Sequence, residues 1–323
     1  MVLANVGWFL AGLGALVAGA EVMVRGATKI STRLGISPLI VGLTVVAIGT
    51  SMPEMAIGVV SASEGSGALA VGNIAGANVI NLMFVLGLSA LILPLAIEMR
   101  TLRAELPVMA GVAILLWLLA ADSVLSRVDG LVLVTGAVVY TGAVVWAARR
   151  ETRDAAAEFD QTYAAVATDG RRTVLHVGMM LGGIAIIVLG AQWLVDAAVG
   201  LARAFSVSDA LIGVTVVAIG TTAPELVTTV VSTLRGDRDI AVGNLLGSSI
   251  YNILLILGVT CLVPAHGLQL TSELVRVDIP IMVAATLACI PIFITGRRVG
   301  RIEGGAMVFA YLAFVVFLLA TQT

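Results

Sequence analysis

Two glutamates stand out because each lies deep inside an apolar stretch of the chain. Glu54 ends the motif GTSMPE (49–54), and Glu225 ends the motif GTTAPE (220–225). An ionisable group at such a depth is costly in a membrane and is by default a candidate for function. Two carboxylates could together bind one cation. The alternative is a pair of neutral, hydrogen-bonded carboxylic acids that only tie helices together.

The residues before each glutamate can supply further oxygen atoms. Proline removes a backbone donor and disrupts the preceding helical turn, so carbonyls around Ala47–Gly49 and Ala218–Gly220 lose their helical partners. In a bilayer such carbonyls need a cavity or a new partner, which a cation provides. Carbonyl, hydroxyl and carboxylate oxygens suit hard cations such as Ca²⁺. No His or Cys is close in sequence to favour Zn²⁺ or Cu²⁺. A kinked helix with back-bonded hydroxyls is the alternative.

A second polar block follows each glutamate motif. The segments AVGNIAGANVIN (70–81) and AVGNLLGSSIYN (241–252) end in Asn81 and Asn252. We expect these two amides to face the carboxylates, with their oxygens available to a cation; interhelical hydrogen bonding is the alternative. For Asn73 and Asn244, which lie nearer the span ends, hydrogen bonding is the interpretation we favour.

The composition requires a membrane protein around these motifs. Of 323 residues, 59% are hydrophobic and only 12% are charged, with a mean hydropathy of +1.09; soluble domains carry about 25% charged residues. A soluble enzyme, a nucleic-acid binder and a disordered chain are excluded. Because a span needs about 20 apolar residues, the chain predicts an all-α integral membrane protein with ten spans, near 3–24, 37–61, 70–93, 105–121, 129–148, 173–198, 209–233, 241–263, 277–295 and 303–321.

The charged residues predict how the spans are divided and oriented. The longest polar stretch, 149–172, separates five spans in residues 1–148 from five in residues 173–323. With the N-terminus outside, 15 of the 18 Lys and Arg residues fall in inside loops, as the positive-inside rule demands. We therefore expect a multi-pass protein of the cell membrane, with both termini extracytoplasmic and residues 149–172 forming a cytoplasmic linker loop.

The two halves of the chain repeat each other. A shift of 171 positions aligns residues 42–87 with residues 213–258 without a gap, with 22 identities in 46 pairs. The matches include Gly, Thr, Pro, Glu and Asn, which chance similarity between apolar helices does not produce. Because each half has five predicted spans, the second half enters the membrane from the opposite side. Such inverted-topology repeats are typical of secondary transporters, whose sites lie where the repeats meet.

The paired motifs resemble the two α-repeats of the cation/Ca²⁺ antiporter superfamily, and most closely those of prokaryotic sodium/calcium exchangers. GTSMPE with GNIAGANVIN and GTTAPE with GNLLGSSIYN carry the resemblance, which covers essentially the whole chain. It implies cation sites between spans 2, 3, 7 and 8, with Glu54 and Glu225 as the shared central carboxylates. It further implies backbone-carbonyl Ca²⁺ ligands at Thr50 and Thr221, Na⁺-binding carbonyls at Ala47 and Ala218, hydroxyl ligands at Ser51, Thr222 and Ser248, and an amide ligand at Asn81.

Two positions depart from the family pattern. Ala77 stands where the archaeal pattern has serine, and Asn252 stands where some members have aspartate. In the family that aspartate accompanies K⁺-dependence in the animal subgroup, so K⁺ co-transport is not expected here. The number of Na⁺ ions, and Na⁺ against H⁺ as the coupling ion, stay open.

The resulting expectation is Ca²⁺ extrusion driven by inward Na⁺ through alternating access, with spans 1 and 6 resembling the family's sliding gate pair. The transported ions and the lipid bilayer are the expected partners; no enzyme activity, cofactor, nucleic acid or obligate protein partner is expected. One alternative is a Ca²⁺/H⁺ antiporter that uses the same glutamates, since burial raises a carboxylate pKa. Two more distant alternatives are an intramembrane hydrolase with paired acids and a passive cation channel.

Overall fold

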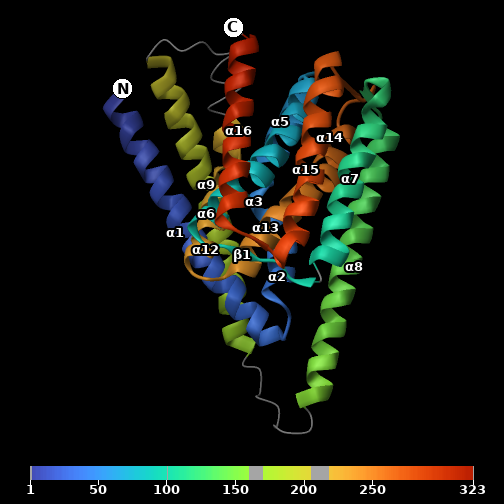
Figure 1. Ribbon diagram of the computed structural model, residues 1–323. Coiled ribbons are helices and arrows are strands. Elements are labelled where there is room, and N and C mark those ends of the chain that lie inside the picture. Colours follow the sequence, from blue (N-terminus) through green and yellow to red (C-terminus); the bar gives the residue numbers. More distant parts are fainter. Residues whose placement is uncertain (1, 100, 160–169, 205–217, 323) are drawn as a thin grey trace. The chain divides into compact units, whose positions relative to one another are not determined.

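Long helices dominate the computed structural model, which describes residues 2–99, 101–159, 170–204 and 218–322 (Figure 1). The α-helices are α1 (Val2–Leu34), α2 (Pro38–Val41), α3 (Ala47–Thr50), α4 (Met52–Ser63), α5 (Gly67–Val79), α6 (Leu86–Ile92), α7 (Leu106–Leu119), α8 (Arg127–Phe159), α9 (Gly170–Ala204), α11 (Ala218–Thr221), α12 (Ala223–Leu234), α13 (Arg238–Tyr251), α14 (Gly258–Leu262), α15 (Ile279–Ile294) and α16 (Arg301–Gln322).

Shorter elements join or interrupt these helices. Wider π-helical segments are η1 (Gly42–Val46), η2 (Ile80–Val85), η3 (Thr101–Glu105), η6 (Asn252–Leu257) and η7 (Leu274–Asp278), and the 3₁₀ turns are η4 (Ala120–Asp122) and η8 (Thr295–Arg297). Two antiparallel strand pairs connect loops: β1 (Leu95–Ala96) pairs with β4 (Arg298–Val299), and β2 (Val124–Leu125) pairs with β3 (Leu268–Gln269).

The described helices account for most of the expected spans. Seven of them are long and apolar enough to cross a membrane, and Pro38–Thr50 with Met52–Ser63 makes an eighth if counted as one broken span. The expected span at 209–233 begins among residues outside the described part, and the span at 303–321 coincides with α16. The protein is thus an all-helical, multi-pass membrane protein, and the count of ten stays a prediction.

The polar stretch after the fifth expected span is partly helical. α8 continues through Phe159, and α9 begins at Gly170. The segment RRETRDAAAEF (149–159) is polar but rich in Ala, Arg and Glu, which are good helix formers. Polarity alone therefore does not end a helix here. Residues 160–169 of the expected linker loop lie outside the described residues.

The chain groups into two compact units that each draw on both sequence halves. Unit 1 comprises residues 1–50 and 138–244, and unit 2 comprises residues 51–137 and 245–323. Glu225 belongs to unit 1, whereas Glu54 belongs to unit 2. Each unit therefore holds one of the two glutamates.

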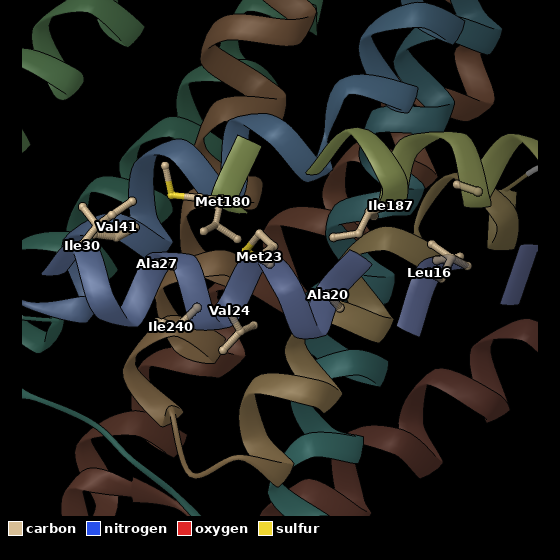
Figure 2. Close-up of a cluster of buried hydrophobic side chains, with 13 residues drawn as sticks. Leu16, Ala20, Met23, Val24, Ala27, Ile30, Val41, Met180, Ile187 and Ile240 are labelled. Atoms are coloured by element: carbon tan, nitrogen blue, oxygen red, sulfur yellow. The ribbon is translucent and has the colours of Figure 1, made fainter. Parts of the chain in front are cut away.

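The core of unit 1 lies where α1 packs along α9. Figure 2 shows Met23 and Ala20 of α1 beside Met180 and Ile187 of α9, and all four side chains are buried. Val227 and Val231 of α12 pack against the same cluster, partly buried. One face of α12 is thereby fixed against an apolar core, which leaves the opposite face for polar groups.

Glycines spaced by seven residues let α1 and α9 approach closely. A Cβ atom built on Gly12 would lie 2.8 Å from the carbonyl oxygen of Gly190, and one on Gly19 would lie 2.8 Å from that of Gly183. A Cβ atom on Gly26 would also come within 3 Å of the α9 backbone. Small residues at such positions allow the backbone contact that holds membrane helices together.

A second, polar contact joins α1 to the end of α12. Glu21 pairs with Arg235 at 2.6 Å and with Arg25 at 2.5 Å. These groups are partly exposed, so the pairs contribute little to stability. Burial raises the pKa of the neighbouring Asp237 carboxyl, and the nearby Thr28 hydroxyl and Arg235 charge only partly offset it.

In unit 2, α5, η2 and α6 pack against α15 and α16, and α4 packs against α5, η6 and α14. A Cβ atom on Gly87 would lie 2.8 Å from the carbonyl oxygen of Gly304, and one on Gly58 would lie 2.7 Å from the Thr260 hydroxyl. The close contacts around Gly58 place α4, which carries Glu54, directly against the helix that follows Asn252.

We expect Gly19→Leu to destabilise the protein because the new side chain collides with the α9 backbone. Overpacking of this kind costs about 1–3 kcal/mol, which purified protein in detergent should show as a lowered Tm. Gly14→Leu is the matched control, since Gly14 lies on the same helix, is exposed and has nothing within 4 Å of its Cβ position. Equal Tm values for the two variants would contradict the close α1–α9 contact.

Candidate cation site

The first glutamate motif breaks its helix. α3 ends at Thr50, Ser51 adopts φ −84° and ψ 11°, and α4 starts at Met52 with proline in its first turn. Glu54 then lies in the first turn of α4 and is fully buried. The break follows from the proline, which lacks the N–H that a continuous helix needs.

The second motif breaks its helix at the equivalent residue. α11 ends at Thr221, Thr222 adopts φ −85° and ψ −2°, and α12 begins with proline in its first turn. Glu225 lies in that first turn and is fully buried. The two motifs, 171 residues apart, therefore fold in the same local way and place their carboxylates at the same point of a helix.

A helix start is a favourable place for a buried carboxylate. The N-terminal turn exposes backbone N–H groups and the positive end of the helix dipole, which stabilise negative charge. Both glutamates use this position. Each unit can therefore hold an ionised carboxylate in surroundings that would otherwise oppose it.

A buried hydrogen-bond bridge lies beside the glutamate helix of unit 1. The Thr50 hydroxyl lies 3.1 Å from Asn244 Oδ1 and 3.3 Å from the Ala47 carbonyl oxygen. Asn244 Nδ2 donates to the Thr229 hydroxyl at 3.1 Å. Asn244 thus links α13 to α3 and α12, which confirms the hydrogen-bonding interpretation of this residue. The same interpretation does not hold for the amide nitrogen of Asn73, which is buried and has no hydrogen-bond partner among the described residues.

The amides of unit 2 behave differently. Asn81 lies in η2 and Asn252 starts η6, both fully buried. Neither polar atom of Asn81 has a hydrogen-bond partner among the described residues, nor does Asn252 Oδ1. A buried polar atom without a partner costs about 1–3 kcal/mol, and π-helical turns occur often at functional sites. These amides are suited to a polar ligand.

The structure places every expected ligand position in one unit or the other. Unit 1 holds Ala47, Thr50, Thr221, Thr222 and Glu225, of which the four after Ala47 are buried polar residues. Unit 2 holds Ser51, Glu54, Asn81, Ser248 and Asn252, all of them fully buried. Ala218 begins α11, and its side chain lies outside the described residues. Ala77 is buried in α5 and supplies no hydroxyl.

Sequence reasoning missed Asn78, which is buried and hydrogen-bonded to Asn252 Nδ2 at 3.1 Å. The repeat alignment pairs Asn78 with Ser249, so a search for matched asparagines passes over it. A search for polar groups one helical turn from Asn81 would have found it.

A row of buried hydroxyls on α12 was also missed. Thr228, Thr229 and Ser232 follow Glu225 at helical spacing and are fully buried. The hydroxyls of Thr228 and Ser232 have no partner among the described residues. Positions three, four and seven residues after Glu225 share its face of the helix, and this periodicity could have identified them from sequence.

Comparison with known proteins identifies the family. The sequence profile described as "Sodium/calcium exchanger protein" matches residues 4–146 and 175–320. The chain belongs to the sodium/calcium exchanger family. The sodium/calcium exchanger MaX1 of Methanosarcina acetivorans is 32% identical over 349 residues, covering 98% of this chain and 99% of MaX1. CaxA of Alkalimonas amylolytica is 35% identical over 317 residues, covering 97% of this chain and 98% of CaxA.

A solved structure shows that the likeness extends to three dimensions. The sodium-calcium exchanger NCX_Mj matches with a TM-score of 0.84 and 27% identity, covering 98% of this chain and 99% of that chain. The family of this chain is a family of transporters, and its fold is that of a sodium/calcium exchanger.

We expect Thr229→Val to destabilise the protein, because it leaves the buried Asn244 Nδ2 without an acceptor. The expected cost is about 1–3 kcal/mol, measured as a lower Tm in detergent. Thr228→Val is the control on the same helix. It removes a buried hydroxyl without a partner among the described residues, so it should be neutral or stabilising. The reverse order of Tm values would contradict the Asn244 bridge.

Proposed function

We propose that this protein is a secondary antiporter that exchanges Na⁺ for Ca²⁺, in which Glu54 and Glu225 supply the two carboxylates that bind one Ca²⁺. The observation that carries the proposal is the pair of fully buried glutamates, each in the first turn after an equivalent helix break. Membership in the sodium/calcium exchanger family restricts the chemistry to cation exchange.

The remaining ligands are oxygen atoms close in sequence to these glutamates. A hard cation such as Ca²⁺ takes six to eight oxygens at about 2.3–2.6 Å, so two carboxylates do not suffice. We assign the further ligands as follows: carbonyls of Thr50 and Thr221 for Ca²⁺, carbonyls of Ala47 and Ala218 for Na⁺, hydroxyls of Ser51, Thr222 and Ser248, and amide oxygens of Asn81 and Asn252.

The charge of the glutamate pair explains why transport is coupled. One Ca²⁺ or a group of Na⁺ ions neutralises two carboxylates, so an occupied site can pass between its two orientations. An empty site keeps two like charges in a medium of low dielectric constant, where their repulsion is strong. The empty form is therefore penalised, and the exchanger cannot release one ion species without taking up the other.

The inverted repeat gives the two orientations of the site. We propose ten spans with both termini extracytoplasmic in the cell membrane, and Ca²⁺ extrusion driven by inward Na⁺. One contact supports the repeat: Asn78 Nδ2 donates to the carbonyl oxygen of Ser249, its equivalent 171 residues later, at 3.1 Å. Equivalent positions can touch only near the axis that relates the two repeats. The close α1–α9 contact supports movement of these two helices as one pair.

Ca²⁺/H⁺ antiport is the second candidate, and Ala77 is the observation that favours it. A buried alanine replaces the serine of the archaeal pattern, so one hydroxyl that could bind Na⁺ is missing. Protons need no such ligand, because they bind the carboxylates directly.

Uptake of ⁴⁵Ca²⁺ into proteoliposomes distinguishes the two candidates. We expect uptake into Na⁺-loaded vesicles when Na⁺ is absent outside, and none into choline-loaded vesicles. A pH gradient without Na⁺ is the second condition. Uptake driven only by the pH gradient would replace Na⁺ by H⁺ as the coupling ion, and uptake without any counter-ion would indicate a channel.

We expect Glu54→Gln and Glu225→Gln each to lower the initial rate of Ca²⁺ exchange more than about a hundredfold, because each leaves a buried Ca²⁺ with an unmatched charge. Glu64→Gln is the matched control, since Glu64 is the exposed residue at the other end of α4, and its rate should equal that of the wild type. A wild-type exchange rate in both glutamate variants would contradict the glutamate-pair mechanism.

A further inference from the structure

A chain of three buried polar groups runs through unit 2. Asn78 Nδ2 donates to the Ser249 carbonyl oxygen at 3.1 Å, and Asn252 Nδ2 donates to Asn78 Oδ1 at 3.1 Å. All three residues are at most 1% exposed. Asn78 Nδ2 also lies 3.8 Å from the sulfur of Met282 on α15, so the side chain is held from a second helix.

The direction of this chain is set at one end. A backbone carbonyl can only accept hydrogen bonds, so Asn78 must turn its NH₂ group toward Ser249. The oxygen of Asn78 then points to Asn252 and can only accept. Asn252 must in turn present its NH₂ group to Asn78, which leaves the Asn252 oxygen at the far side of its amide.

The Asn252 oxygen is where a ligand would be needed. It is buried and has no hydrogen-bond partner among the described residues, and it belongs to the first residue of the π-helical segment η6. A cation binds an amide through its oxygen, whereas the NH₂ group carries positive partial charge and repels it. The orientation of this amide therefore decides whether Asn252 can act as a ligand at all.

We propose that Asn78 is a positioning residue that fixes the Asn252 amide with its oxygen toward the transported cation. The proposal rests on the proposed function, because it takes Asn252 as a cation ligand.

The two repeats differ in this arrangement of hydrogen bonds. The residue equivalent to Asn78 in the second repeat is Ser249, whose hydroxyl donates to the Leu245 carbonyl oxygen of its own helix at 2.9 Å. Asn81, the equivalent of Asn252, has no hydrogen-bond partner on either amide atom among the described residues. One of the two central amides is thus held in a fixed orientation, and the other is left to adjust to its ligand.

Asn78→Leu tests the proposal because leucine has the same branched arrangement of side-chain heavy atoms as asparagine but can make neither hydrogen bond. We expect the KM for Ca²⁺ to rise about tenfold, with the maximal exchange rate changed much less. The rise in Tm that Ca²⁺ produces in purified protein should shrink in parallel, since ligand stabilisation follows affinity. Thr286→Val is the matched control: Thr286 is a buried residue of α15 whose hydroxyl donates to the Met282 carbonyl oxygen of the same helix at 2.8 Å, and its KM should equal that of the wild type.

An aspartate at position 252 separates orientation from packing. A carboxylate has an oxygen at both ends and needs no partner to choose between them. In the Asn252→Asp background we therefore expect Asn78→Leu to change the KM less than about twofold. A tenfold loss in both backgrounds would show that Asn78 acts through packing and would overturn the proposal. Asn78→Ala, which also removes both hydrogen bonds, serves in place of Asn78→Leu if the latter does not fold.

Asn252→Ala, compared with Asn78→Leu and with the glutamate variants, separates this proposal from the proposed function. If Asn252→Ala raises the KM but Asn78→Leu does not, Asn252 is a ligand without help from Asn78, and the positioning role is wrong while the exchanger mechanism stands. If Asn252→Ala leaves the KM unchanged, the ligand role of Asn252 fails and the positioning role with it. Wild-type exchange by Glu54→Gln and Glu225→Gln would instead remove the glutamate-pair mechanism itself.

Discussion

The cost of placing charge and unpaired polar groups in an apolar medium is the constraint on which this structure depends. Two glutamates are fully buried in a chain that is 59% hydrophobic, and water cannot stabilise them there. Each is placed at the start of a helix, where backbone N–H groups and the helix dipole favour negative charge. The proline in each motif creates that helix start. One residue type therefore both opens the backbone and prepares the position that the carboxylate occupies.

The polar residues around the glutamates divide into two kinds. Asn244 has both amide atoms engaged within unit 1, by Thr50 and Thr229, and it stabilises the contact between helices. Asn81 and Asn252 keep buried atoms without partners among the described residues, an energetic cost that a bound ligand would remove. Under the proposed function, asparagine therefore holds helices together at position 244 and binds the cation at positions 81 and 252, and hydrogen bonding distinguishes the two roles. The chain belongs to the sodium/calcium exchanger family, so the amides without partners have a proposed use as ligands in cation exchange.

Most of the fold class and part of the candidate site could be predicted from the sequence, because membrane burial limits the chain to helices and shows in hydropathy alone. Eight of the expected spans correspond to apolar helices or to the broken pair in the described residues. The helical continuation of α8 to Phe159 was not anticipated, since a polar segment can be helical or not depending on propensity that hydropathy does not measure. Asn78 was missed because its repeat equivalent is a serine, so symmetry in the sequence does not mark it.

By itself the sequence determined that this is a helical membrane protein, that its halves repeat at an offset of 171 residues, and that each half carries one buried glutamate behind a proline break. These features follow from composition and from local backbone chemistry, which do not depend on which helices pack against each other. Only the tertiary structure decided that Asn244 bridges Thr50 and Thr229. It also decided that α1 and α9 pack closely through their glycines. The hydrogen bonds of Asn78 with Ser249 and Asn252 likewise come from the tertiary structure. A hydrogen bond between residues some 170 positions apart depends on how helices are packed, and an amide orientation depends on the acceptor it meets. Neither is encoded in the spacing of residues along the chain.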